Sequence, residues 1–79
     1  MFIDVVEVQP QPGHQLLLQY ENGELRRFDV TPFLALKPWQ CLGPAHLFER
    51  VFVENGTVAW PGNIDMAPET LYDLSNPVR

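Results

Sequence analysis

Residues 14–30 read HQLLLQYENGELRRFDV, and this stretch decides the fold. It consists of two apolar runs, His14–Tyr20 and Leu25–Val30, separated by a tetrapeptide that contains Asn22-Gly23. Asn-Gly between two apolar runs is the strongest local signal for a β-hairpin, because both residues adopt positive φ at little cost. The stretch therefore predicts two antiparallel strands joined by a tight turn.

The register of this hairpin decides which side chains share a face of the sheet. A two-residue loop at Asn22-Gly23 pairs Tyr20 with Leu25 and Leu18 with Arg27. Side chains alternate between the two faces, so this pairing assigns one set to one face (Leu16, Leu18, Tyr20, Leu25, Arg27 and Asp29) and another set to the other (Leu17, Arg26, Phe28 and Val30). Both sets contain large apolar residues, so both faces are expected to be partly covered.

Turn residues divide the rest of the chain into short elements. The run Phe2–Val8 predicts a strand that ends at the turn Gln9–Gly13, because proline cannot continue a hydrogen-bonded ladder. Thr31 is expected to cap a short helix with Pro32 at its first position. Arg50–Val53 and Thr57–Trp60 predict strands joined by a second Asn-Gly turn.

The last element predicted is a helix over Pro68–Leu74, with Pro68 at its first position, Leu71 and Leu74 facing the sheet, and Asn76-Pro77 ending it. The order is therefore three strands, a short helix, two strands and a final helix. This order predicts the fold class α+β, a small antiparallel sheet of about five strands with short helices on one side. A chain of 79 residues is expected to form a single domain, residues 1–79, with its first strand at a sheet edge.

Composition limits the class of protein. Hydrophobic residues make up 46% of the chain, which excludes an intrinsically disordered protein. Ten acidic against five basic residues give a net charge of −5. This balance argues against direct binding of nucleic acid, because neutralising phosphates requires clustered lysine and arginine.

The sequence also predicts a compartment. Cys41 is the only cysteine, so no internal disulfide can form. The opening residues MFIDVVE lack a basic region and include two carboxylates, so a signal peptide is not expected. No run approaches the ~20 apolar residues that a membrane helix needs. We therefore expect a cytoplasmic protein with no membrane association.

One segment carries a family resemblance. Residues 60–72, WPGNIDMAPETLY, together with the stretch ENGELRRFDV and the second Asn-Gly hairpin, resemble a bacterial family catalogued as domain of unknown function 2442. The resemblance covers roughly Val5–Tyr72 and implies a small α+β cytoplasmic protein. It implies no reaction, because the family has no established activity. Some members lie beside a second small protein in pairs that resemble toxin–antitoxin modules, and some carry a helix-turn-helix that residues 1–79 lack.

The end of the strand Thr57–Trp60 offers a candidate ligand site. Trp60, Asn63 and Asp65 supply an aromatic ring, an amide and a carboxylate that can line a small pocket. The alternative is structural: Trp60 packs under the final helix, and Asn63 or Asp65 accepts hydrogen bonds from backbone amides of the turn or of the helix start. The structural role is favoured, because Asn and Asp near turns usually bond to the backbone.

Three further residues are candidates for binding a partner. Arg26 and Arg27 form the only adjacent basic pair and can receive an acidic partner or a phosphate. Asp29 is expected to pair with Arg27 on the strand surface or to bond near Thr31. Trp39, in an apolar connector, is either an exposed anchor for a partner or a residue that folds back onto the core.

No catalytic or metal-binding arrangement is complete. Cys41 and His46, with or without His14, lack the four ligands and close pairs of a zinc site. We expect a buried, inert thiol and exposed imidazoles. Ser75 lacks the context of a nucleophile elbow, and the glycines lie in turns rather than in a phosphate-binding loop. The sequence therefore predicts no catalytic residue, no metal and no cofactor.

Two functions remain. The first is a non-enzymatic interaction module that binds another small protein, or a second copy of itself, through Trp39, Arg26, Arg27 and an exposed sheet face or edge. Its acidic charge would attract a basic partner, and an antitoxin-like role rests on the family resemblance alone. The alternative is a small-ligand-binding domain or an unrecognised enzyme that uses the corner formed by Trp60, Asn63 and Asp65. Arg27 or Asp29 would contribute to that site.

Overall fold

The computed structural model describes residues 3–78 and contains two antiparallel sheets. The four-stranded sheet has the order β1 (Val5–Gln11), β2 (Gln15–Tyr20), β3 (Leu25–Asp29) and β7 (Asn76–Pro77). The three-stranded sheet has the order β4 (Phe52–Glu54), β5 (Thr57–Trp60) and β6 (Ile64–Asp65). The α+β class is confirmed. The strands form two sheets rather than one, and β6 and β7 add short pairings where the sequence predicted a turn and the end of the last helix.

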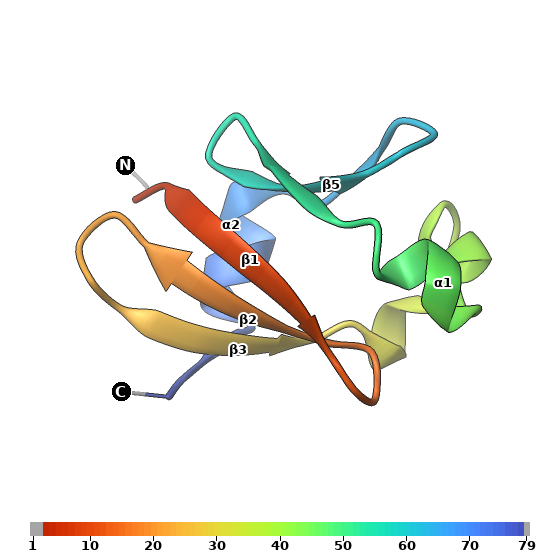
Figure 1. Ribbon diagram of the computed structural model, residues 1–79, viewed down its shortest axis with the longest axis horizontal. Coiled ribbons are helices and arrows are strands. Elements are labelled where there is room, and N and C mark those ends of the chain that lie inside the picture. Colours follow the sequence, from red (N-terminus) through yellow and green to blue (C-terminus); the bar gives the residue numbers. More distant parts are fainter. Residues whose placement is uncertain (1–2, 79) are drawn as a thin grey trace.

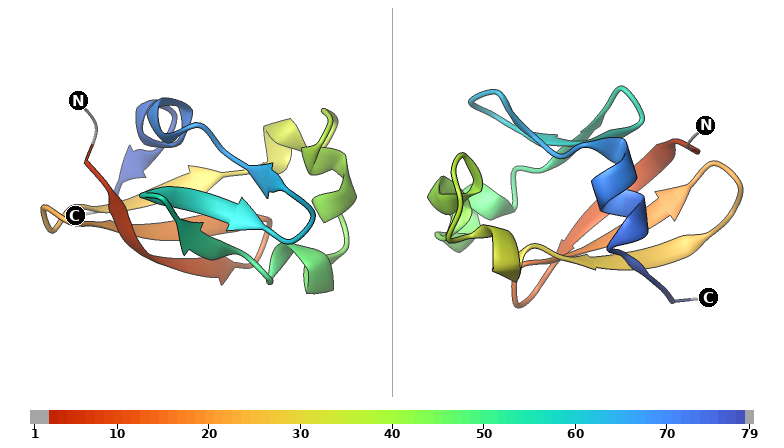
Figure 2. Two further views of the ribbon diagram at one scale, coloured as in Figure 1. Left: turned by 90° about the horizontal axis from the view of Figure 1, so that it is seen from above. Right: turned by 180° about the vertical axis from the view of Figure 1, so that it is seen from behind.

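The helical segments lie in two places (Figures 1 and 2). Two 3₁₀ segments, η1 (Thr31–Phe33) and η2 (Trp39–Leu42), and the short helix α1 (Ala45–Phe48) gather at one end of the molecule, between the two sheets in sequence. The helix α2 (Pro68–Asp73) lies between the sheets at the other end, where Leu71 is fully buried. The core thus lies between the inner faces of the two sheets, with a helical cover at each end.

The first hairpin has a different register from the one predicted. Leu18 pairs with Arg26, and Gln19 pairs with Leu25. The loop is one residue longer, because the Gly23 amide donates to the Tyr20 carbonyl at 2.9 Å and Gly23 alone carries the positive φ, 91°. This is the geometry of a three-residue loop with glycine in the left-handed position.

The one-residue shift reverses the face assignment of the returning strand. Five apolar residues now share the inner face, and each is at most 2% exposed: Leu16, Leu18, Tyr20, Phe28 and Val30. Arg26 lies on this face with Leu18, and Arg27 lies on the other. The predicted register had the two arginines the other way round. The longer loop is favoured because it buries the apolar residues of both strands on one face of the sheet. The two-residue loop would place Leu18 and Phe28 on opposite faces.

Of the other two predicted turns, one is confirmed and one begins later in the chain than predicted. Asn55-Gly56 forms the predicted two-residue hairpin, with positive φ at both positions (52° and 77°). The first strand, in contrast, continues through Pro10 to Gln11 rather than ending at Val8. Proline is tolerated there because β1 is an edge strand. Phe2, the predicted start of that strand, lies outside the described residues.

The helix ends also differ in detail. The N-cap of η1 is Val30, and the Thr31 hydroxyl donates to the Gly13 carbonyl instead of capping. The helix α2 begins at Pro68 as predicted, but Leu74 is 59% exposed and only Leu71 packs inward. The helix ends one residue before Leu74, so the Leu74 side chain does not lie on the buried face of the helix with Leu71.

Candidate functional site

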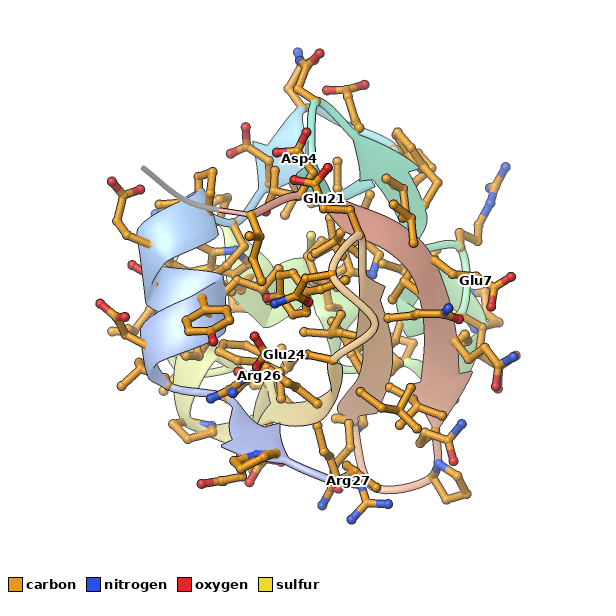
Figure 3. The ribbon with its side chains drawn as sticks, turned by 90° about the vertical axis from the view of Figure 1, so that its left-hand side faces the viewer. Asp4, Glu7, Glu21, Glu24, Arg26 and Arg27 are labelled. Carbon is orange, nitrogen blue, oxygen red and sulfur yellow. The ribbon has the colours of Figure 1, made fainter. Side chains whose placement is uncertain are left out.

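Arg26 lies inside the molecule rather than on a binding surface, with a side chain only 13% exposed. Its Nη1 pairs with Glu24 Oε1 at 2.9 Å, its Nε donates to the Ser75 hydroxyl, and its Nη2 donates to the Ser75 carbonyl at 3.0 Å. The guanidinium carbon also lies 4.2 Å from the centre of the Tyr72 ring. Arg26 therefore ties the first hairpin to the carboxyl end of α2, as cationic side chains often do at helix ends (Figure 3).

Tyr20 lies beside this cluster and carries an unsatisfied group. Its ring meets the Tyr72 ring edge-on at 5.2 Å, and its hydroxyl has no hydrogen-bond partner among the described residues. Burial raises the pKa of Tyr20 to about 12. A buried hydroxyl without a partner destabilises the folded state, because its hydration is lost and not replaced.

Tyr20→Phe is therefore expected to leave the free energy of unfolding unchanged or to raise it by up to about 1 kcal/mol, because the orphaned hydroxyl is removed and the ring contacts remain. Tyr72→Phe is the matched control, since the Tyr72 hydroxyl donates to Glu24 at 2.9 Å and its loss should destabilise the protein. Urea denaturation measures both. Destabilisation by Tyr20→Phe would show that the hydroxyl is satisfied in solution.

Glu24 gives the cluster a pH dependence. Hydrogen bonds from Asn22, Tyr72 and Arg26 hold the pKa of Glu24 below its ordinary value of 4.5. The hydrogen bond to Glu24 in turn raises the pKa of Tyr72. Because the folded state favours the ionised carboxylate, its contribution to stability is fully present above the unfolded pKa and is lost as the pH falls through the folded pKa.

Glu24→Gln is expected to flatten the fall in stability on acidification below about pH 5, because the substituted amide has no proton to gain. The measurement is the free energy of unfolding in urea at a series of pH values. The same change at Glu7, an exposed residue of β1, is the matched control. An unchanged slope in the Glu24 variant would contradict this role of the carboxylate.

Arg27, in contrast, lies on the exposed outer face of the four-stranded sheet (Figure 3). It pairs across the strands with half-buried Leu17. The predicted surface pair with Asp29 is absent, since the Arg26–Glu24 contact is the one ion pair among residues 3–78. The Asp29 carboxylate instead accepts a hydrogen bond from the Thr31 amide at 2.9 Å, which was the other option predicted for it.

The free edge of β1 is poorly suited to pairing with another chain. The Tyr20 amide donates to the Glu24 carbonyl on the β3 side, and alternation along the ladder then turns the backbone groups of Val8 and Pro10 toward the free edge. Proline has no N–H to donate there. A bulge at Val6 interrupts the ladder further. The predicted edge position is confirmed, and the edge carries the features that block strand addition.

Trp39 folds back against the protein. It is half-buried, its ring meets the Phe33 ring edge-on at 5.3 Å, and it packs against the core. Its Nε1 donates to the backbone carbonyl of Asp65 at 3.0 Å. Of the two roles predicted for Trp39, the structure places it in the inward one, where it covers the outer edge of β6 rather than standing free as an anchor.

The corner formed by Trp60, Asn63 and Asp65 does border a pocket. The pocket has a volume of about 270 Å³ and lies on the outer face of the three-stranded sheet. Nine residues line it: Phe52, Glu54, Ala59, Trp60, Pro61, Gly62, Asn63, Ile64 and Asp65. Arg27 and Asp29, which the sequence analysis grouped with this corner, do not line it.

The three predicted residues contribute to this pocket in different ways. The Trp60 side chain is buried in the core, 1% exposed, and its Nε1 donates to the Phe48 carbonyl at 2.9 Å. Asn63 turns the chain with a positive φ of 62°. The predicted capping role of Asp65 is wrong, because the N-cap of α2 is Ala67, with no side-chain hydrogen bond. The Asp65 carboxylate is instead exposed at the pocket.

Phe52, Glu54 and Ala59 are pocket residues that the sequence analysis did not single out. The hairpin pairing contained the signal, because Phe52 lies opposite Ala59 and Glu54 opposite Thr57. Alternation then assigns Phe52 and Glu54 to one face and half-buried Val53 to the other. Only the third strand, β6, was missing from that prediction.

The other candidate side chains lie apart. Cys41 is exposed, which corrects the predicted buried thiol, and its Sγ donates to the Pro38 carbonyl. His14 is half-buried, with its Nε2 2.8 Å from the Gly43 carbonyl, whereas His46 is exposed. Ser75 is buried in the Arg26 cluster. Within residues 3–78 no group of metal-ligating side chains gathers, and no helix has the length and apolarity to cross a membrane.

The fold and these surfaces define a small α+β domain with an acidic pocket on the outer face of β4–β6. The family described as "Protein of unknown function (DUF2442)" matches residues 5–77, so the chain belongs to that family and the predicted resemblance is confirmed. Neither the search of curated proteins nor the search of solved structures found a significant match.

Proposed function

We propose that this chain is a non-enzymatic interaction module that binds a basic partner protein in the cytoplasm. The observation that supports this proposal is the pocket on the outer face of β4–β6, whose lining includes the carboxylates Glu54 and Asp65 and no basic residue. A net charge of −5 adds long-range attraction for a basic protein. The same charge disfavours nucleic acid and anionic membrane surfaces as partners.

The distribution of shifted pKa values supports binding over catalysis. Tyr20, Glu24 and Tyr72 have shifted pKa values, and all three belong to the cluster around Arg26. That cluster joins the first hairpin to α2 through hydrogen bonds among its own members. Shifted groups in an active site usually border a cleft that receives substrate, whereas these groups hold two structural elements together.

The size of the pocket favours a side chain of a partner over a separate small molecule. Its volume of about 270 Å³ lies just below the range of roughly 300–1,000 Å³ typical of ligand pockets. A partner side chain gains the rest of its affinity from surrounding contacts, which a free ligand of the same size lacks. Binding of a small ligand at Asn63 and Asp65 remains the second candidate, supported by the same cavity.

Co-expression with the product of the adjacent gene tests the proposal. The expected result is a complex whose mass in solution equals the sum of the two proteins, and whose formation weakens as salt increases because the surface is acidic. An antitoxin-like role adds the expectation that the complex suppresses toxicity of the partner. A protein that stays alone beside its neighbour and binds no basic protein would contradict the proposal, and a self-associated species would replace it with a homodimer.

A further inference from the structure

The pocket arises from a row of three residues across the sheet. Ala59 of β5 pairs with Phe52 of β4 on one side and with Asp65 of β6 on the other. Side chains at paired positions point to the same face, here the outer one. A methyl group between a phenyl ring and a carboxylate leaves a hollow, so the row has an aromatic wall, an apolar floor and an acidic wall.

The hollow faces solvent rather than the core. Ala59 is 3% exposed but does not belong to the core cluster, which contains its neighbours Val58 and Trp60. Phe52 is 39% exposed, a large fraction for a phenyl ring in a strand. Phe52 lines the pocket and belongs neither to the core cluster nor to the apolar residues packed against it.

The charge in the pocket has one sign. Glu54 lies two residues after Phe52 in β4, so both side chains point to the same face, and Asp65 lies on the other side of Ala59. No lysine, arginine or histidine lines the pocket, and neither carboxylate takes part in an ion pair among residues 3–78. An aromatic face beside carboxylates attracts a cation by its quadrupole and by direct charge.

The backbone beneath the acidic wall of the pocket is held in place before any ligand arrives. Trp39 Nε1 donates to the Asp65 carbonyl at 3.0 Å, and the Thr57 hydroxyl donates to the Met66 carbonyl at 2.7 Å. The turn before β6 has positive φ at Gly62 (99°) and at Asn63 (62°). A site fixed in this way loses little conformational entropy on binding.

We propose that this pocket receives an arginine side chain of the partner protein, with its guanidinium between the Phe52 ring and the Asp65 carboxylate. Arginine fits better than lysine, because its planar group stacks on an aromatic face and donates two parallel hydrogen bonds to a carboxylate. This inference rests on the proposed function and names the chemical group that the partner must present.

The test is an NMR titration of the full chain with N-acetyl-arginine methylamide, with N-acetyl-citrulline methylamide as the neutral control of the same shape. The arginine probe should shift amide signals at residues 52–54, 59 and 63–65, and the citrulline probe should not. Asp65→Asn should raise the dissociation constant about fivefold and Phe52→Leu about threefold. Asp73→Asn, at an exposed position of α2, is the charge-matched control and should change nothing. Spectra of each variant without probe confirm its fold.

Three outcomes distinguish a failure of the arginine pocket from a failure of the proposed interaction function. Equal shifts with both probes, or shifts confined to the outer face of β1–β3, overturn the arginine pocket. If a partner complex also forms and survives Asp65→Asn, the interaction function stands and only the pocket assignment falls. Selective binding of the arginine probe, joined to loss of the partner complex in Asp65→Asn but not in Asp73→Asn, supports both.

Discussion

Replacing Arg26 with alanine is expected to lower the free energy of unfolding by about 2 kcal/mol, whereas Arg27→Ala should change it by less than about 0.5 kcal/mol. The two residues are neighbours with the same side chain, but Arg26 is nearly buried and Arg27 is exposed. Removing Arg26 leaves the Glu24 carboxylate and the Ser75 carbonyl without their charged donor. The cost stays below the ~3–5 kcal/mol of a fully buried ion pair, because Glu24 is 31% exposed and water can reach it.

Urea denaturation of both variants gives the comparison, with circular dichroism as the probe. Arg26→Lys should fall between the wild type and alanine, because an ammonium retains the charge but not the planar fork that reaches Glu24 and Ser75 together. A larger cost at position 27 than at position 26 would show that the hairpin has the shorter loop, in which the two arginines occupy reversed faces. Equal costs would contradict the burial of Arg26.

The positions of these two arginines also show which parts of the structure could be predicted from the sequence and which could not. The pattern of apolar runs and Asn-Gly turns was sufficient for the strands and for the α+β class. It was insufficient for the first register, because a loop of two or three residues satisfies the same ENGE tetrapeptide. The decision came from tertiary packing: only the longer loop places Leu18 and Phe28 on one buried face. In the second hairpin Asn55 takes positive φ, so the two-residue loop was correct.

The candidate pocket shows the same division between local and tertiary information. Asn63 and Asp65 were identified because polar residues after a strand are visible in the sequence, and both line the pocket. Phe52 was not identified, because its partner across the sheet, Ala59, becomes the floor of a hollow only when β6 pairs on the far side. The strand β6 has two residues, too few for a periodic signal.

From the sequence, each tryptophan had a binding role and a packing role as alternatives. The structure packs both against the protein, Trp60 in the core and Trp39 at its edge. Trp60 is 1% exposed, lies 6.1 Å ring to ring from Phe48, and donates its indole N–H to the Phe48 carbonyl. It therefore joins β5 to α1 across the core. Trp39 is half-buried at the edge of β6 and loses less contact area if it is removed.

Trp60→Ala is expected to lower the free energy of unfolding by about 4 kcal/mol, because it opens a large cavity and leaves a carbonyl without its donor. That is a large part of the ~5–10 kcal/mol expected for a small domain, so the variant should be partly unfolded at 37 °C. Trp39→Ala, the matched control, should cost about 1–2 kcal/mol, since Trp39 is already partly exposed to solvent. Thermal denaturation followed by circular dichroism measures both.

A graded variant keeps the comparison informative if Trp60→Ala does not fold. Trp60→Phe preserves much of the ring contact with Phe48 but removes the N–H, and should cost about 2 kcal/mol. A cost at Trp39 that equals or exceeds the cost at Trp60 would contradict the assignment of Trp60 to the core. The order of the three variants also bears on the pocket, because Trp60 is the strand neighbour of Ala59, its floor. We expect a pocket built on so heavily packed a strand to bind without rearranging, and this rigidity is what the proposed recognition of a guanidinium requires.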